Sequence, residues 1–183
     1  WSSGLNDYSP TGYLIKKGVH PETIINASEN QVINYPWPLI RLGELYLNYA
    51  ESLNEAYGSA RHIEVIQYLD LIRKRSGVPG VLEAWAIVGK SSFSKEEMRS
   101  IIRQERNIEL SYEGHRAWDV RRWKQGELFN VPVKGFDITA SSPQSFYTPV
   151  DVENRVFTQA YYLFPIRISE TEINQNLVQN PGW

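Results

Sequence analysis

Apolar residues recur at helical spacing in the first half of the chain and predict two consecutive helices. The first is expected to begin at Pro38, because proline suits the first helical position, and to end at Gly58. Ser59 can cap the second helix, whose apolar stripe runs to Arg75 and stops at the turn formed by residues 76–80. Since so short a link places two helices antiparallel, we expect an αα-hairpin of the kind that builds helical repeats.

A second pair of helices is predicted downstream. Ser94 and Glu97 form a capping box, S-x-x-E, ahead of an apolar run that extends to about Tyr112. Gly114 marks a break, and residues 115–124 then predict a shorter helix. Two such pairs predict a mainly α fold of TPR-like αα-hairpins, of the alpha-alpha superhelix type.

The segments outside these helices lack a sustained period. We expect an extended arm at residues 1–35, helical hairpins within 36–126, a long loop region at 127–162 and a C-terminal tail at 163–183. In the tail, Ser169 is predicted to cap a single helical turn. The fold is therefore expected to carry long irregular loops and at most short strands.

Charge and composition narrow the class of protein. Nineteen Lys and Arg residues balance 21 Asp and Glu residues, which excludes the broad basic surface of a nucleic-acid binder. A hydrophobic content of 42% predicts a packed core, and no apolar run approaches the about 20 residues of a membrane span. There is no cysteine, the chain opens with Trp1, and its one methionine is Met98. We therefore expect a piece of a longer protein, with any signal sequence or lipid-modified cysteine upstream.

Carboxylates lie on the apolar stripe of the third predicted helix. Met98, Ile108 and Tyr112 help to define that stripe, yet Glu105 and Glu109 fall on it, and inward carboxylates need partners or a solvated cleft. One hypothesis is a carboxylate pair for glycoside hydrolysis, which nearby arginines disfavour because they keep carboxylates ionised. The favoured hypothesis is a structural ion-pair network, with acidic and basic residues recurring at helical spacing: Glu105, Arg106, Glu109, Glu113, Arg116, Asp119 and Arg122.

Other motifs carry little chemistry. The segment AWAIVGKS at 84–91 resembles a phosphate loop, but its bulky residues and the absence of a preceding strand argue against nucleotide binding. The three histidines are scattered, so no metal site is predicted. We expect no cofactor, although Asp151, Glu153 and Asn154 leave a structural calcium open.

Aromatic residues make up 13% of the chain, and several fall in predicted loops. A ring in a loop either packs back on the core or faces a ligand, and packing is the commoner role for any single ring. Sugars offer apolar faces that stack on such rings. The glycan-binding candidates are Trp1, Trp85, Phe146 and Tyr147.

Five sequence blocks together resemble one family. They are TGYLIKK (11–17), YPWPLIRLGELYLNYAESLNEAYG (35–58), YLDLIRKRSG (68–77), ERNIELSYEGHRAWDVRRW (105–123) and LFPIRISETEINQNLVQNPGW (163–183). In this order they resemble the C-terminal half of the SusD/RagB family, the glycan-binding surface lipoproteins of Bacteroidetes. The departures are small and comprise Asn107, Arg167 and Trp183.

The resemblance implies a non-catalytic protein of polysaccharide utilisation, built on TPR-like hairpins. Its expected ligand is an oligosaccharide or polysaccharide, and its expected partner is a SusC-like TonB-dependent transporter. The expected location is the cell-surface face of the outer membrane, with a lipid anchor on an upstream cysteine. The alternative is a helical-repeat scaffold for protein interaction, with no sugar site of its own in this part of the protein.

Overall fold

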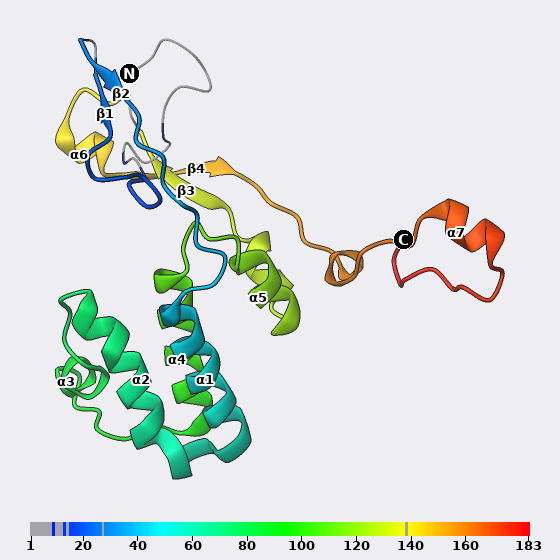
Figure 1. The fold of residues 1–183 in the computed structure, drawn as a ribbon, viewed down its shortest axis with the longest axis horizontal. Coiled ribbons are helices and arrows are strands. Elements are labelled where there is room, and N and C mark those ends of the chain that lie inside the picture. Colours follow the sequence, from blue (N-terminus) through cyan, green and yellow to red (C-terminus); the bar gives the residue numbers. More distant parts are fainter. Residues whose placement is uncertain (1–8, 10–12, 14, 27, 138) are drawn as a thin grey trace. The chain divides into compact units, whose positions relative to one another are not determined.

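Helices predominate in the residues that the structure describes (Figure 1). The computed structural model describes residues 9, 13, 15–26, 28–137 and 139–183. These divide into a helical unit, Gly18–Arg116, and a C-terminal unit, which comprises Ala117–Trp183 and the described residues before Gly18. The mainly α fold class expected from the apolar pattern is confirmed.

The helical unit is built on a pair of antiparallel helices. α1 spans Leu42–Tyr57 and α2 spans His62–Arg75, with the 3₁₀ turn η1, Gly58–Arg61, between them. α4, Lys95–Glu109, packs against both, and the short helix α3, Val81–Ala86, packs against α2. The unit is therefore a bundle of three helices, with α3 at the side of α2.

The core of this unit lies where α1, α2 and α4 meet. Leu47 of α1, Leu69 of α2, and Met98 and Ile102 of α4 are completely or almost completely buried in one apolar cluster. Each such side chain contributes about 1.5–3 kcal/mol when removed from water. The capping box also forms, because Ser94 Oγ accepts from the Glu97 amide at 3.2 Å and Glu97 Oε2 accepts from the Ser94 amide at 2.8 Å.

Two helix starts differ from the prediction. α1 begins at Leu42 and not at Pro38, because Arg41 adopts an extended backbone (φ −133°, ψ 157°) and its side chain is bound elsewhere. Ser59 does not cap α2, because it lies within η1 and Arg61 occupies the N-cap without a side-chain hydrogen bond. At the start of α1 the boundary depends on contacts of Arg41 that local capping preferences do not encode.

The end of α4 differs as well. The helix ends at Glu109, and Tyr112 has a left-handed backbone (φ 64°) that cannot continue it. Ile108 and Tyr112 are exposed, so their predicted inward position is wrong. The buried face instead passes through Met98 and Ile102 to Glu105 and Glu109.

Two pairs of short antiparallel strands complete the set of described strands. In the helical unit β1, Ile24–Ile25, pairs with β2, Asn30–Gln31. In the C-terminal unit β3, Val133–Phe136, pairs with β4, Pro149–Glu153, with an irregularity in register at Val133 and Lys134. The second strand pair falls within the region that the sequence predicts as a long loop, where short alternating segments such as these leave little periodic signal.

The C-terminal unit has short helices. They are α5 (Arg116–Arg122), η2 (Gly126–Asn130), α6 (Pro143–Phe146), η3 (Gln159–Tyr162) and α7 (Ile168–Ile173). Ser169 lies inside α7, whose N-cap is Arg167, so the predicted cap is wrong. The second predicted hairpin, between α4 and α5, stays a prediction, because these helices lie mainly in different units.

Side chains of residues 179–183 bind the backbone of residues 160–166. The Gln179 side chain accepts from the Ile166 amide and donates to its carbonyl, both at 2.8 Å. Asn180 Nδ2 donates to the Phe164 carbonyl at 2.6 Å, and Trp183 Nε1 donates to the Ala160 and Leu163 carbonyls at 3.0 Å. The closing QNPGW segment thus satisfies backbone groups of a stretch that has little regular structure.

Asn54 and His62 form a buried polar contact in the core of the helical unit. Asn54 Nδ2 donates to the Lys95 carbonyl at 3.1 Å, which directs Asn54 Oδ1 to His62 Nε2 at 3.0 Å. Nε2 therefore carries a hydrogen. Burial lowers the pKa of His62 below its usual value of 6.5, because the charged ring loses hydration.

This lowered pKa predicts a loss of stability in mild acid. As the pH falls below about 6.5, the unfolded chain binds a proton at His62 before the folded chain does, so the contribution present at neutral pH is lost. His62→Gln keeps an amide donor and removes the titration. Urea unfolding of wild type and variant between pH 7 and pH 5 should give a shallower decline for the variant, and equal slopes would contradict the prediction.

Candidate functional site

The helical unit contains a groove with a volume of about 610 Å³. α2, α3, the segment after α3 and α4 contribute side chains to it, and most of the lining surface is apolar. The residues that line it are Arg73, Trp85, Lys90, Phe93, Glu97, Ser100, Ile101, Gln104, Glu105 and Ile108. The size is that of a small-ligand site, for which 300–1,000 Å³ is typical.

Two aromatic rings form one wall of the groove. Trp85 lies edge-on to Phe93, with ring centroids 5.8 Å apart. Phe93 is only 8% exposed and belongs to the core, whereas Trp85 is 37% exposed. The Lys90 ammonium lies 6.0 Å and 5.8 Å from the two ring centroids, within reach of a cation–π contact. The buried ring thus supports an accessible one.

Trp85 lies in α3 and not in a loop as predicted. The helix begins where Asp70 of α2 accepts a hydrogen bond from the Val81 amide at 2.7 Å. A Cβ at Gly80 would lie 2.9 Å from the Asp70 carboxylate, so the chain approaches α2 closely at this point. A six-residue helix is too short to show a helical period, and a contact from α2 stabilises its first turn.

The groove lining contains two ion pairs. Lys90 Nζ binds the Glu97 carboxylate, and Arg73 binds the Glu105 carboxylate. Arg73 Nε also donates to the Pro79 carbonyl at 2.6 Å. The hydrogen bond from Lys90 holds the pKa of Glu97 below its usual value, and the Ser94 amide adds to this effect.

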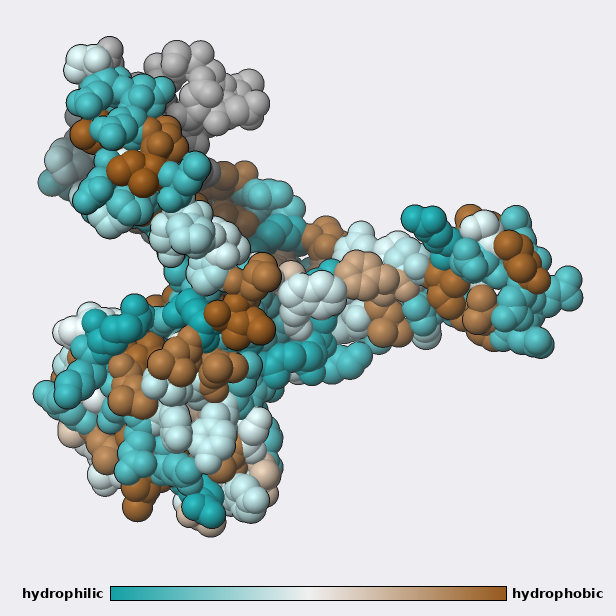
Figure 2. Space-filling model, in the orientation of Figure 1, coloured by the Kyte–Doolittle hydropathy of each residue, from teal (hydrophilic) through white to brown (hydrophobic). Residues whose placement is uncertain are grey.

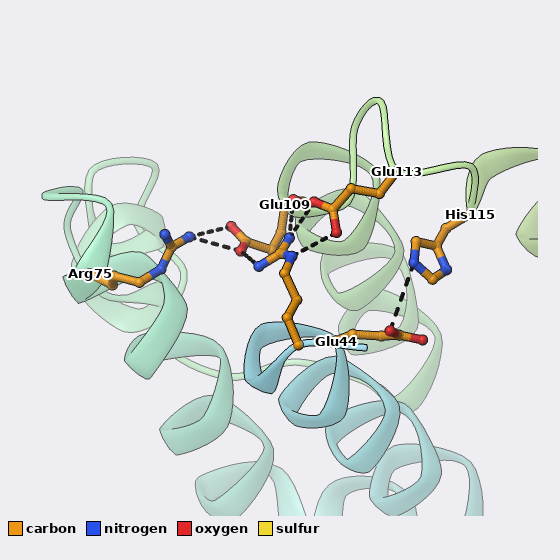
Figure 3. A network of polar contacts seen from close by, with 6 residues as sticks. Glu44, Arg75, Glu109, Glu113 and His115 are labelled. Atoms are coloured by element: carbon orange, nitrogen blue, oxygen red, sulfur yellow. Dashed lines mark hydrogen bonds and ion pairs between the residues drawn. The ribbon is translucent and has the colours of Figure 1, made fainter. Parts of the chain in front are cut away.

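A second polar cluster joins the ends of α1, α2 and α4 (Figure 3). Arg41 donates to both carboxylate oxygens of Glu113 at 2.6 and 2.7 Å, to the Glu109 carbonyl at 2.6 Å and to the Glu109 carboxylate. Arg75 donates to both oxygens of Glu109 at 2.8 and 2.7 Å. The hydrogen bond to Glu113 raises the pKa of Arg41 above its usual range. Nearby, His115 Nε2 lies 3.8 Å from Glu44 Oε2.

The structure gives several predicted network residues partners from distant elements. Glu105 pairs with Arg73, and Glu109 pairs with Arg41 and Arg75, three arginines that the sequence analysis does not name as partners of these glutamates. The other residues of the predicted network, which helical spacing indicated, also make polar contacts or begin a helix. Arg106 donates to Asn48 at 2.6 Å, Arg122 pairs with Asp119 at 2.8 Å, and Arg116 begins α5.

The predicted glycan-binding aromatics fall in different places. Phe146 of α6 and Tyr147 cluster with Phe136 of β3, with ring centroids 5.0–5.8 Å apart, and Tyr147 is largely exposed. These rings belong to the C-terminal unit, whereas Trp85 belongs to the helical unit. Trp1 lies outside the described residues. Phe146 is the last residue of α6 and is not in a loop.

Metal binding and membrane crossing concern the residues that the structure describes. No group of three or more His, Asp or Glu side chains in this set is arranged to hold a metal ion. Asp151, one of the residues considered for calcium, pairs with Lys134. None of the described helices combines the length and the apolar character that crossing a membrane requires.

Comparison with known proteins assigns the family. The model of the SusD family matches residues 2–183. The chain belongs to the SusD family. The resemblance seen in the five sequence blocks is thereby confirmed.

Curated SusD-like proteins of Formosa agariphila are similar to this SusD-family chain. It is 32% identical to SusD-like protein P2 over 151 residues, which cover 79% of this chain and 25% of that protein. It is 28% identical to SusD-like protein P25, over 85% of this chain and 24% of that protein. The chain thus spans about a quarter of the length of the curated relatives that it matches.

Solved structures that are similar in sequence to this chain also share its fold. The crystal structure of a SusD-like protein from Bacteroides fragilis matches 86% of this SusD-family chain with a TM-score of 0.67 and 27% identity, over 28% of its own length. The selenomethionine form of BT4246 matches 97% with a TM-score of 0.78 and 31% identity, over 30% of its own length. The mainly helical architecture is therefore shared with SusD-like structures.

The cluster around Glu109 predicts a large effect on stability at Arg41. Arg41→Ala leaves the buried carboxylate of Glu109 short of a partner and should lower the free energy of unfolding by about 3 kcal/mol. The control is Arg61→Ala, which removes an exposed pair with Glu64 and should cost less than about 1 kcal/mol. Urea unfolding measures both, and equal losses would contradict this role of Arg41.

The aromatic wall predicts two unequal effects. Phe93→Ala opens a cavity in the core and should cost about 3–4 kcal/mol, whereas Trp85→Ala removes a partly exposed ring and should cost about 1–2 kcal/mol. Chemical unfolding of both variants tests this difference. A larger loss for Trp85→Ala would show that its ring is chiefly structural and would remove its use as a binding probe.

Proposed function

We propose that the protein containing this chain binds a glycan at the bacterial surface and delivers it, uncleaved, to a SusC-like TonB-dependent transporter. The observation that carries the proposal is the match to the SusD family over residues 2–183. The proposal includes a place in polysaccharide utilisation and a lipid anchor in the outer membrane, on a cysteine upstream of this chain.

The groove beside Trp85 is the proposed glycan contact within this chain. A partly exposed indole backed by a buried ring offers a rigid apolar surface, on which the apolar face of a sugar can stack. Gln104 and Glu105 line the same groove and can bind hydroxyl groups. Tyr147 in the C-terminal unit is the second proposed contact, and Phe146 supports its ring.

The arginines around the inward carboxylates favour binding over hydrolysis. A glycosidase needs one carboxyl group that donates a proton and a second that acts as nucleophile or base. Glu105 is bound by Arg73 and Glu109 by Arg41 and Arg75, so both carboxylates are already engaged by guanidinium groups of the protein. We therefore propose that the ion-pair network is structural and that the protein is not an enzyme.

A helical-repeat interaction scaffold is the second candidate function. Apolar side chains just before α1 and in its first turn are exposed, including Leu39 (88%), Ile40, Leu42 and Leu45. Figure 2 shows brown, apolar residues among hydrophilic ones on the visible face of the helical unit. Contiguous exposed apolar residues often mark protein interaction surfaces.

Isothermal titration against a panel of oligosaccharides tests the proposed function. We expect at least one glycan to bind, and Trp85→Ala to weaken binding about tenfold through loss of the stacked ring. Tyr57→Ala is the control, because it removes an exposed ring of α1 outside the groove. The Tyr57→Ala variant should bind glycan as the wild type does.

Three results would change the proposal. Binding that survives Trp85→Ala and fails in Tyr147→Ala would move the contact to the C-terminal unit. Capture of the outer-membrane transporter without binding of any glycan would favour the scaffold. Hydrolysis of a glycan that disappears in Glu105→Gln would contradict a non-catalytic role.

A further inference from the structure

The charges that line the groove form two compensated pairs. Two cations, Lys90 and Arg73, and two carboxylates, Glu97 and Glu105, reach the groove, and each cation contacts one carboxylate. We propose that the groove binds an uncharged sugar unit and that Glu97 and Glu105 exclude acidic sugars. This rests on the proposed function and assigns a ligand class to the same site.

The exclusion follows from the contacts that the two cations already make. A uronate or sulfate group near Lys90 would have to displace the Glu97 carboxylate or lie beside it, and near Arg73 it would meet Glu105 in the same way. Placing like charges side by side weakens binding. Exchanging one ion pair for another adds little favourable binding free energy. Arg73 has little freedom to turn away, because it also binds the Pro79 carbonyl.

The rest of the lining suits an uncharged ligand. Trp85 offers a ring for stacking, Ile101 and Ile108 add apolar surface, and Ser100 and Gln104 supply neutral hydrogen-bonding groups. Neutral polar groups bind hydroxyls without requiring a charge on the ligand. The affinity for such a ligand is expected to depend little on salt, because it needs no net ionic contact.

Glu97 allows this proposal to be tested with little risk to the fold. It is exposed, and it caps α4 through a hydrogen bond from the Ser94 amide to its side-chain oxygen. Glutamine also serves in a capping box, so Glu97→Gln keeps the cap and removes the charge. Glu96→Gln is the matched control, because it makes the same charge change one residue away, in the same helical turn, at a residue that does not line the groove.

The experiment is titration of the full chain with matched pairs of oligosaccharides. The pairs are oligogalacturonides and their carboxyl-reduced forms, alginate oligomers and their carboxyl-reduced forms, and sulfated galactan oligomers and their desulfated forms. For a pair that binds, we expect the uncharged member to bind more tightly and to lose affinity in Trp85→Ala. Glu97→Gln should raise the affinity for the acidic member about two- to fivefold, and by more than it changes the affinity for the uncharged member. Glu96→Gln should change neither.

The outcomes separate this proposal from the function on which it rests. Tighter binding of the acidic member that depends on Trp85 would overturn the ligand class and leave glycan binding intact. Equal effects of Glu97→Gln and Glu96→Gln would also overturn the ligand class, since a general charge effect would then explain the change in affinity. Binding that is unaffected by Trp85→Ala would overturn the site. Silence from every member of all pairs would overturn the groove as a glycan contact and favour the interaction scaffold for this part of the protein.

Discussion

A buried carboxylate that three helices must satisfy together organises the helical unit. Glu109 lies at the end of α4 and is only 9% exposed, so its charge has to be compensated within the protein. Arg41 reaches it from the start of α1 and Arg75 from the end of α2. Because each partner belongs to a different helix, the charge is satisfied only when all three helices hold one register. Apolar packing among leucines and isoleucines is less selective, since such side chains tolerate small displacements.

The same register prepares the groove. Arg73 and Arg75 lie two residues apart at the end of α2, and they bind carboxylates one helical turn apart on α4. Arg73 binds Glu105 in the groove lining, while Arg75 binds Glu109 in the cluster with Arg41. The two ion pairs therefore tie the groove to the core. A shift of α4 along α2 would break both pairs, and it would also move the residues of α4 that face Trp85.

Local rules predicted the elements of the helical unit better than they predicted its boundaries. The capping box of Ser94 and Glu97 forms because both partners lie within one helical turn. The stripe from Met98 to Glu109 was recognisable from its spacing, including its carboxylates. The start of α1 was missed because Arg41 is drawn into contacts with residues about 70 positions away. Likewise α3 was missed because it depends on Asp70 of another helix and has only six residues of its own.

The sequence by itself determined the helical class, the inward position of Glu105 and Glu109, the candidate ring of Trp85 and, through its five blocks, the SusD family. These depend on spacing within one helix or on the order of recognisable segments, and both can be read along the chain. Only the tertiary structure decided which arginines satisfy the carboxylates and that Trp85, Lys90 and Glu105 line one groove. The physical reason is that side chains of opposite charge pair with whatever the fold brings within about 3 Å, and separation in sequence does not limit that choice.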